Sequence, residues 1–166
     1  QEAIQEDPQF APAYVLLGAF SQAVEQNDQA EAYFRKALTL EPENSEALQG
    51  FGLFLVSQER YTEALPYLEK HLKGNPDNSL SLDGLIESSH HLPGKEKQIR
   101  AALQKAWDIS KNPELGIRYG RYLLDNGEPQ NARNILSAVV EVSKTPVSLA
   151  ELALTCDLTH DCNCAI

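Results

Sequence analysis

Residues 11–44 read APAYVLLGAFSQAVEQNDQAEAYFRKALTLEPEN, and the next 34 residues repeat the pattern of this stretch. Small, apolar and proline positions recur one period later at the same places. A fixed period of this length is typical of stacked-repeat architectures, in which each repeat is one supersecondary unit. The matched pairs are Gly18 and Gly52, Ala30 and Ala64, Phe34 and Leu68, and Pro42 and Pro76.

Each repeat is predicted to be a pair of helices. Apolar residues follow helical spacing on both sides of a polar break at residues 26–28. Asp28, followed three residues later by Glu31, fits a capping box at the start of the second helix. Pro42 is expected to end that helix, because proline lacks an amide donor and disfavours helix in the residue before it.

At these positions the chain resembles the tetratricopeptide-repeat family, from Gln1 to about Pro146. The resemblance implies an all-α fold, an α-solenoid of stacked antiparallel helical hairpins. The third repeat departs from the family pattern, since Ile86 holds the glycine position. The expected divisions are 1–10 as the tail of a preceding repeat, 11–44 and 45–78 as repeats, 79–112 as a degenerate repeat, 113–146 as a fourth repeat, and 147–166 as a capping helix and tail.

Length and composition favour one solenoid domain of 166 residues, 42% of them hydrophobic. We expect it to be a fragment of a longer protein, because Ala3–Pro8 copies the spacing of Ala37–Pro42 and methionine is absent. The sequence has no run of 18 apolar residues and no visible secretory leader. We therefore expect no membrane insertion by this segment and a cytoplasmic location.

The chain is acidic, with 24 acidic and 14 basic residues and a formal charge of −10. This charge argues against nucleic acid and anionic membrane surfaces as partners, since both attract basic proteins. Residues 1–94 carry 15 acids and 5 bases, whereas residues 95–166 carry 9 of each. Solvated helix surfaces are the preferred interpretation. A basic ligand or head-to-tail contact between copies are the alternatives.

Motifs for catalysis are absent from the sequence: it has no glycine-rich phosphate loop, Gly-x-Ser-x-Gly elbow or His-Glu-x-x-His pair. We predict no enzyme activity and no cofactor. The tail places Cys156, His160, Cys162 and Cys164 within nine positions. These are weak zinc-ligand candidates, because their spacing matches no usual zinc framework. Reduced thiols are preferred, since the other 155 residues hold no cysteine, and zinc or a disulfide are alternatives.

The family resemblance also implies a concave groove, lined mainly by the first helix of each repeat, that binds a peptide or partner helix. Members that clamp a terminal carboxylate use Lys, Asn and Arg, where this chain has Val15, Ala19, Gly50, Leu80 and Gly84. We expect instead an amphipathic or extended ligand with a basic side chain near the acidic residues of the third repeat. The groove candidates are Val15, Ala19, Gln22, Gln49, Leu53, Val56, Asp83, Glu87, His90, Ile117 and Arg121.

Histidines outside the tail have plainer expected roles. His71 stands where the first repeat has Ala37, and we expect a partly covered residue between repeats. His90 and His91 are expected as an exposed loop pair at a helix end rather than a metal or pH-sensing site. The sequence thus predicts a non-catalytic scaffold for protein binding. Head-to-tail self-association and a regulatory domain of a larger enzyme are the alternatives.

Overall fold

The computed structural model describes residues 9–159, with side chains as far as Cys156. Within these residues every element is an α-helix and no strand is present, which confirms the predicted all-α helical repeat solenoid. The chain divides into two compact units, Gln1–Ile99 and Arg100–Ile166. The division falls within helix α7 (Glu96–Ser110), and each unit is described by itself. That the whole chain is a single domain stays a prediction.

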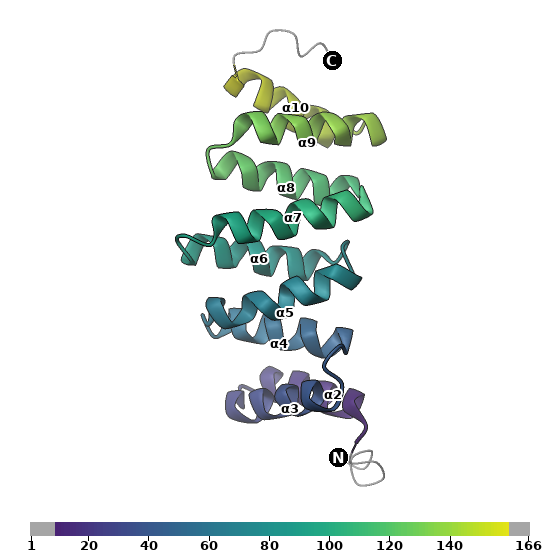
Figure 1. Ribbon diagram of the computed structural model, residues 1–166, viewed down its shortest axis with the longest axis vertical. Coiled ribbons are helices and arrows are strands. Elements are labelled where there is room, and N and C mark those ends of the chain that lie inside the picture. Colours follow the sequence, from purple (N-terminus) through teal and green to yellow (C-terminus); the bar gives the residue numbers. More distant parts are fainter. Residues whose placement is uncertain (1–8, 160–166) are drawn as a thin grey trace. The chain divides into compact units, whose positions relative to one another are not determined.

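Unit 1 contains two complete hairpins and the first helix of a third (Figure 1). Within each hairpin the two helices pack side by side, and α4 also contacts the helices before and after it. The helices are α2 (Ala11–Ala23), α3 (Asn27–Leu40), α4 (Ser45–Ser57), α5 (Tyr61–Gly74) and α6 (Ser79–His91).

The core of unit 1 is built around large side chains that fit against glycines. Phe34 of α3 lies between Gly18 of its own hairpin and Gly50 of the next one. A Cβ atom at Gly18 or Gly50 would lie only 2.9 or 2.8 Å from the Phe34 ring. The Phe34 ring centroid is 6.1 Å from that of Phe51 and 5.9 Å from that of Phe54. The period therefore conserves close approach between helices, as interior packing at crystal-like density requires.

Leu68 of α5 repeats this arrangement one period later. A Cβ atom at Gly52 would lie 2.6 Å from Leu68, and one at Gly84 would lie 3.0 Å from it. The small residue that α6 offers to the preceding hairpin is thus Gly84. Ile86, which holds the family's glycine position, is only half-buried.

Three first helices begin with an asparagine cap, which the sequence analysis missed. The side-chain oxygen of each asparagine accepts a backbone N–H from the first turn at 2.9 Å, so one orphan amide at each helix start is satisfied. The caps recur every 34 residues, at Asn44, Asn78 and Asn112.

The predicted capping box of α3 is wrong. This helix begins at Asn27 after Gln26, and no side chain caps it. Glu31 instead binds Arg60 at the start of α5 and Arg35 one turn along α3. An arginine partner in the next hairpin competes for the carboxylate that a capping box would have used.

Two expectations about α5 also need correction. Pro66 lies inside the helix rather than in its first turn, so one backbone hydrogen bond of α5 is lost there. His71 is not partly covered: it is 3% exposed, and its Nδ1 lies 2.8 Å from Oγ of Ser81 in α6. Burial lowers the pKa of His71, because charging the ring away from water is unfavourable.

Unit 2 is built from most of α7 and from α8 (Pro113–Asp125), α9 (Pro129–Val142) and α10 (Pro146–Thr159). Leu136 of α9 fits against α8, where a Cβ atom at Gly120 would lie 2.7 Å from it. Trp107 is 2% exposed, and its ring packs against α8. Gly127, with φ of +71°, ends α8 as predicted. Helix α10 contacts both α8 and α9, the position expected of a terminal helix.

Candidate functional site

The predicted binding residues of unit 1 lie on α2, α4 and α6, which contact one another in that order. We call the surface formed by these residues the α2–α4–α6 face. Val15 is 8% exposed and therefore offers a ligand little surface. The half-buried members are Gln22, Gln49, Leu53 and Val56, and the exposed members are Ala19, Asp83, Glu87 and His90.

Leu53 and Val56 lie where α4 contacts α6. A Cβ atom at Gly84 would lie 3.2 Å from Leu53 and 3.7 Å from Val56. Gln49 Nε2 donates a 2.9 Å hydrogen bond to Oδ1 of Asn78, the residue that caps α6. The face therefore offers partly exposed apolar side chains at a contact that is already fixed by packing and by a neutral hydrogen bond.

The α6 part of the face is acidic. Asp83 and Glu87 are both exposed, one helical turn apart. Oε1 of Glu87 lies 3.2 Å from Nε2 of His91, and the His91 ring stacks on Tyr61 of α5 with centroids 4.4 Å apart. His90 and His91 belong to the last turn of α6, so the loop predicted for them is wrong, although both are exposed as expected.

In unit 2, Ile117 is half-buried and Arg121 is exposed on α8. Nη2 and Nε of Arg121 lie 2.5 and 2.9 Å from Oε1 of Glu151 in α10. These hydrogen bonds raise the pKa of Arg121. Arg121 therefore links α8 to α10, a structural role that the sequence analysis did not anticipate.

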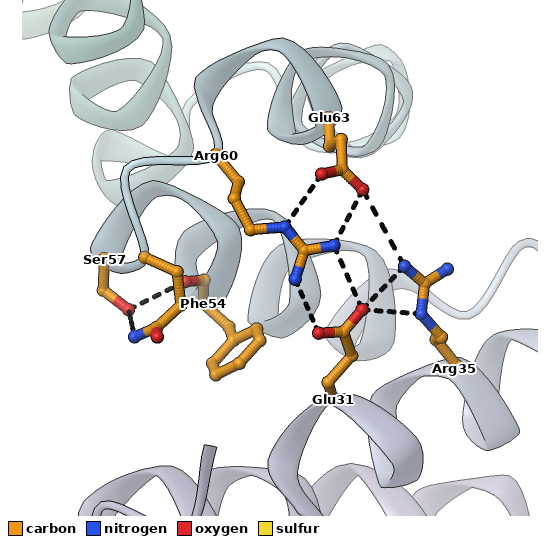
Figure 2. Close-up of polar contacts among 7 residues, drawn as sticks. Glu31, Arg35, Phe54, Ser57, Arg60 and Glu63 are labelled. Atoms are coloured by element: carbon orange, nitrogen blue, oxygen red, sulfur yellow. Dashed lines mark hydrogen bonds and ion pairs between the residues drawn. The ribbon is translucent and has the colours of Figure 1, made fainter. Parts of the chain in front are cut away.

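A network of four charged side chains joins α3 to the start of α5 (Figure 2). Arg60 donates to Glu31 at 2.5 Å and to Glu63 at 2.8 Å. Arg35 contacts Glu31 at 2.7 Å and Glu63 at 3.8 Å. Hydrogen bonds from Arg60 lower the pKa of both carboxyl groups. All four residues are at least partly exposed, so the network links two hairpins and is no buried catalytic pair.

Three surface cavities of unit 1, of about 580, 360 and 270 Å³, are lined by residues of α3, α4, α5 and the α3–α4 connection. None of the predicted binding residues lines them. Lys70 borders two of the cavities, and its Nζ donates to the Pro42 carbonyl at 2.7 Å and lies 2.6 Å from Glu43. This surface is the natural comparison for the α2–α4–α6 face.

The candidate metal residues of the tail cannot be assembled into a site. Cys156 is disulfide-bonded, which agrees with the disulfide alternative and not with the preferred reduced thiol. His160, Cys162 and Cys164 lie outside the described residues. Among the residues that are described, no three His, Cys, Asp or Glu side chains gather as a metal ion would need. Over the same residues, no helix is both long and apolar enough to cross a bilayer.

Comparison with known proteins gives one family match. Residues 22–81 match a model of the tetratricopeptide repeat. None of the curated protein sequences matches the chain.

Several solved structures share the fold. YrrB, described as a TPR protein with an unusual peptide-binding site, is 23% identical with a TM-score of 0.64, over 98% of this chain and 84% of its own. PilF of Pseudomonas aeruginosa is 23% identical with a TM-score of 0.66, over 96% and 73%. MamA is 16% identical with a TM-score of 0.65, over 90% and 82%.

The family model covers the end of the first hairpin and the whole of the second. The helical hairpins on both sides of that stretch, and the structural neighbours that span nearly the whole chain, extend the likeness. The chain is a tetratricopeptide-repeat protein.

Proposed function

We propose that this protein is a non-catalytic scaffold that binds a peptide or helix of a partner protein across the α2–α4–α6 face of unit 1. Tetratricopeptide-repeat proteins serve in general as scaffolds for protein–protein interaction. The observation that carries the finer proposal is the pairing of partly exposed Leu53 and Val56 with exposed Asp83 and Glu87 on the neighbouring helix.

The chemistry of the face selects its ligand. Apolar side chains contribute about 25 cal/mol for each Å² removed from water, so Leu53 and Val56 supply affinity. Exposed charge pairs contribute only about 0.2–1 kcal/mol, so Asp83 and Glu87 supply orientation and choice of partner. A matching ligand is an amphipathic or extended segment with a basic side chain beside its apolar residues. The peptide-binding site described for YrrB supports a peptide as ligand.

The experiment is affinity capture from native cell extract with the original chain and two double variants. Leu53→Ala/Glu87→Ala alters the proposed face. Leu38→Ala/Glu43→Ala is the matched control, because it removes the same two residue types beside the cavities of α3 and α5. Far-ultraviolet circular dichroism checks that all three chains fold alike.

A partner held by the original and the control, but lost by Leu53→Ala/Glu87→Ala, supports the proposal. The opposite pattern assigns binding to the cavity surface and contradicts it. Proteins retained equally by all three chains contradict it as well, since no ligand then depends on the face.

Self-association is the second candidate, and the uneven charge of residues 1–94 and 95–166 favours it. Contacts between opposite charges weaken as salt screens them. Head-to-tail assembly would therefore raise the molar mass with protein concentration and lower it with salt. A groove-binding scaffold would keep a constant molar mass and gain stability only with its ligand. Service as a regulatory domain of a larger enzyme would use the same face, with the ligand supplied by that enzyme.

The cytoplasmic location predicted from the sequence is weakened by the disulfide at Cys156. Disulfides persist mainly in oxidising compartments, whereas cytosolic thiols are kept reduced. Alkylation of free thiols in intact cells, followed by mass spectrometry of the Cys156 peptide, decides the matter. Complete labelling fits the cytoplasm, and protection from labelling fits an oxidising compartment.

A further inference from the structure

Helix α2 presents an apolar face that nothing in the described chain covers. Its residues, Ala11–Ala23, include no charged side chain. Leu16 is 71% exposed, Phe20 is 65% exposed and Val24, just past the helix end, is 45% exposed. Residues four apart lie on one side of a helix. Single exposed apolar residues are ordinary, but a continuous stripe of them marks an interaction surface.

The 34-residue period shows what this face is built to contact. Phe20 corresponds to Phe54 of α4, which is 1% exposed. The Phe54 ring centroid lies 5.9 Å from that of Phe34 in α3. On α4, therefore, the same face is covered by the second helix of the preceding hairpin. By correspondence, the exposed face of α2 fits a helix that packs as α3 does.

The register adds a requirement on that helix. Leu16 corresponds to Gly50 and Gly84, the two glycines that receive Phe34 and Leu68 of the preceding hairpins. Because Leu16 fills the space that glycine leaves open, a large side chain would not fit there. The helix that packs on α2 must carry a small residue where α3 carries Phe34.

A polar contact identifies how the helix joins α2. Lys36 corresponds to Lys70, whose Nζ donates to the Pro42 carbonyl just after α3. The matching carbonyl for Lys36 belongs to Pro8, which lies outside the described residues. In the sequence, Ala3–Pro8 repeats the spacing of Ala37–Pro42.

We propose that the face of α2 formed by Leu16, Phe20 and Val24 docks the second helix of a tetratricopeptide hairpin. This helix runs into α2 through Ala3–Pro8 and has a small side chain opposite Leu16. The proposal does not depend on ligand binding at the α2–α4–α6 face.

The test supplies such a hairpin to the full chain. Residues 1–8 are replaced by a second copy of residues 9–42, so that the copied proline stands in the place of Pro8. One extended chain keeps phenylalanine at the position copied from Phe34, and another carries Phe34→Ala in the copy only. Hydrogen exchange of the α2 backbone amides is then compared with that of the unextended chain. Exposed Phe20→Glu serves as a surface variant that leaves the α2–α3 core untouched.

We expect the Phe34→Ala copy to slow exchange in α2 by roughly tenfold, since burial of even one large apolar side chain is enough for this. The phenylalanine copy should slow it less, and Phe20→Glu should abolish both gains. Leu16→Gly should reverse the preference, so that the phenylalanine copy protects α2 better. Unchanged exchange with both copies, or a gain that survives Phe20→Glu, would overturn the proposal. A dimer of the unextended chain that Phe20→Glu dissolves would also overturn it, because a second copy would then be the occupant.

Discussion

The two units join successive hairpins at the same place with opposite charges. In unit 1, Arg60 directly precedes α5 and binds Glu31, the fifth residue of α3. In unit 2, Glu128 directly precedes α9 and lies 2.6 Å from Arg100, the fifth residue of α7. The fold thus uses an ion pair at this position and accepts either sign. A charged residue in this chain is accordingly weak evidence of function until its partner is known.

The same contrast separates the predicted binding residues. In unit 2, Arg121 is held by Glu151 of a neighbouring helix. In unit 1, Leu53 and Val56 are only half-buried at a contact fixed by the neutral bond of Gln49 to Asn78. The comparison indicates that unit 2 uses its predicted residue for its own packing, whereas unit 1 leaves apolar surface for a ligand.

The largest expected effect compares equivalent core residues of the two units. Phe34→Ala empties the space between two glycines and should lower the free energy of unfolding by about 4 kcal/mol. Leu136→Ala, at the same position of the period, should lower it by about 3 kcal/mol. Urea unfolding followed by circular dichroism measures both. A cost below about 1 kcal/mol at Phe34 would show that the glycine contacts do not hold the hairpins together.

The next effect is a pH dependence confined to unit 1. Burial lowers the pKa of His71 in the folded chain, so below about pH 6.5 the unfolded chain binds this proton first. Stability is therefore complete above this range and falls as the pH drops, by at most about 1.4 kcal/mol per pH unit. Glu69, Lys70, Lys73 and Glu43 lie around the same cavity and set the local charge.

Unfolding curves between pH 7 and 5 test this dependence with His71→Gln and, as its control, exposed His91→Gln. The fall should flatten in His71→Gln and remain in His91→Gln. Equal curves for the three chains would mean that the contact of His71 with Ser81 does not select the neutral ring.

A charge exchange tests whether either sign serves at the link between hairpins. In unit 2, Arg100→Glu and Glu128→Arg should each cost about 1 kcal/mol, because each places like charges together at a partly exposed site. The double variant should recover most of the loss. If the double variant is as unstable as the sum of the single ones, the sign is fixed by groups other than this pair.

The smallest effect concerns the link between α8 and α10. Glu151→Gln removes the charge that holds Arg121 and should cost about 0.5 kcal/mol at low salt, with a smaller cost at high salt. Thermal unfolding at two salt concentrations measures the difference. A cost that salt does not change would point to packing, not to the ion pair.

The fold was readable from the sequence because its determinants recur. Gly18, Ala30 and Pro42 return one period later, since every hairpin repeats the same close crossing and the same stop. The second glycine of the ladder was missed because Leu16 breaks it in the first repeat, so that Gly50 and Gly84 carry no signal there.

The polar links were beyond the sequence for a different reason. Arg60 lies 29 residues from Glu31, and Arg121 lies 30 residues from Glu151. At that separation, only the packing of one hairpin on the next decides which side chains meet. The capping box failed on this point, and Arg121 was assigned to a ligand when its partner is α10.

The most direct test of the central claim is hydrogen exchange of the chain with and without a captured partner. The account predicts that the partner slows exchange in α4 around Leu53 and in α6 around Glu87, while α3 and α5 stay unchanged. Protection confined to α3 and α5, around Leu38 and Lys70, would contradict it and assign binding to the cavity surface.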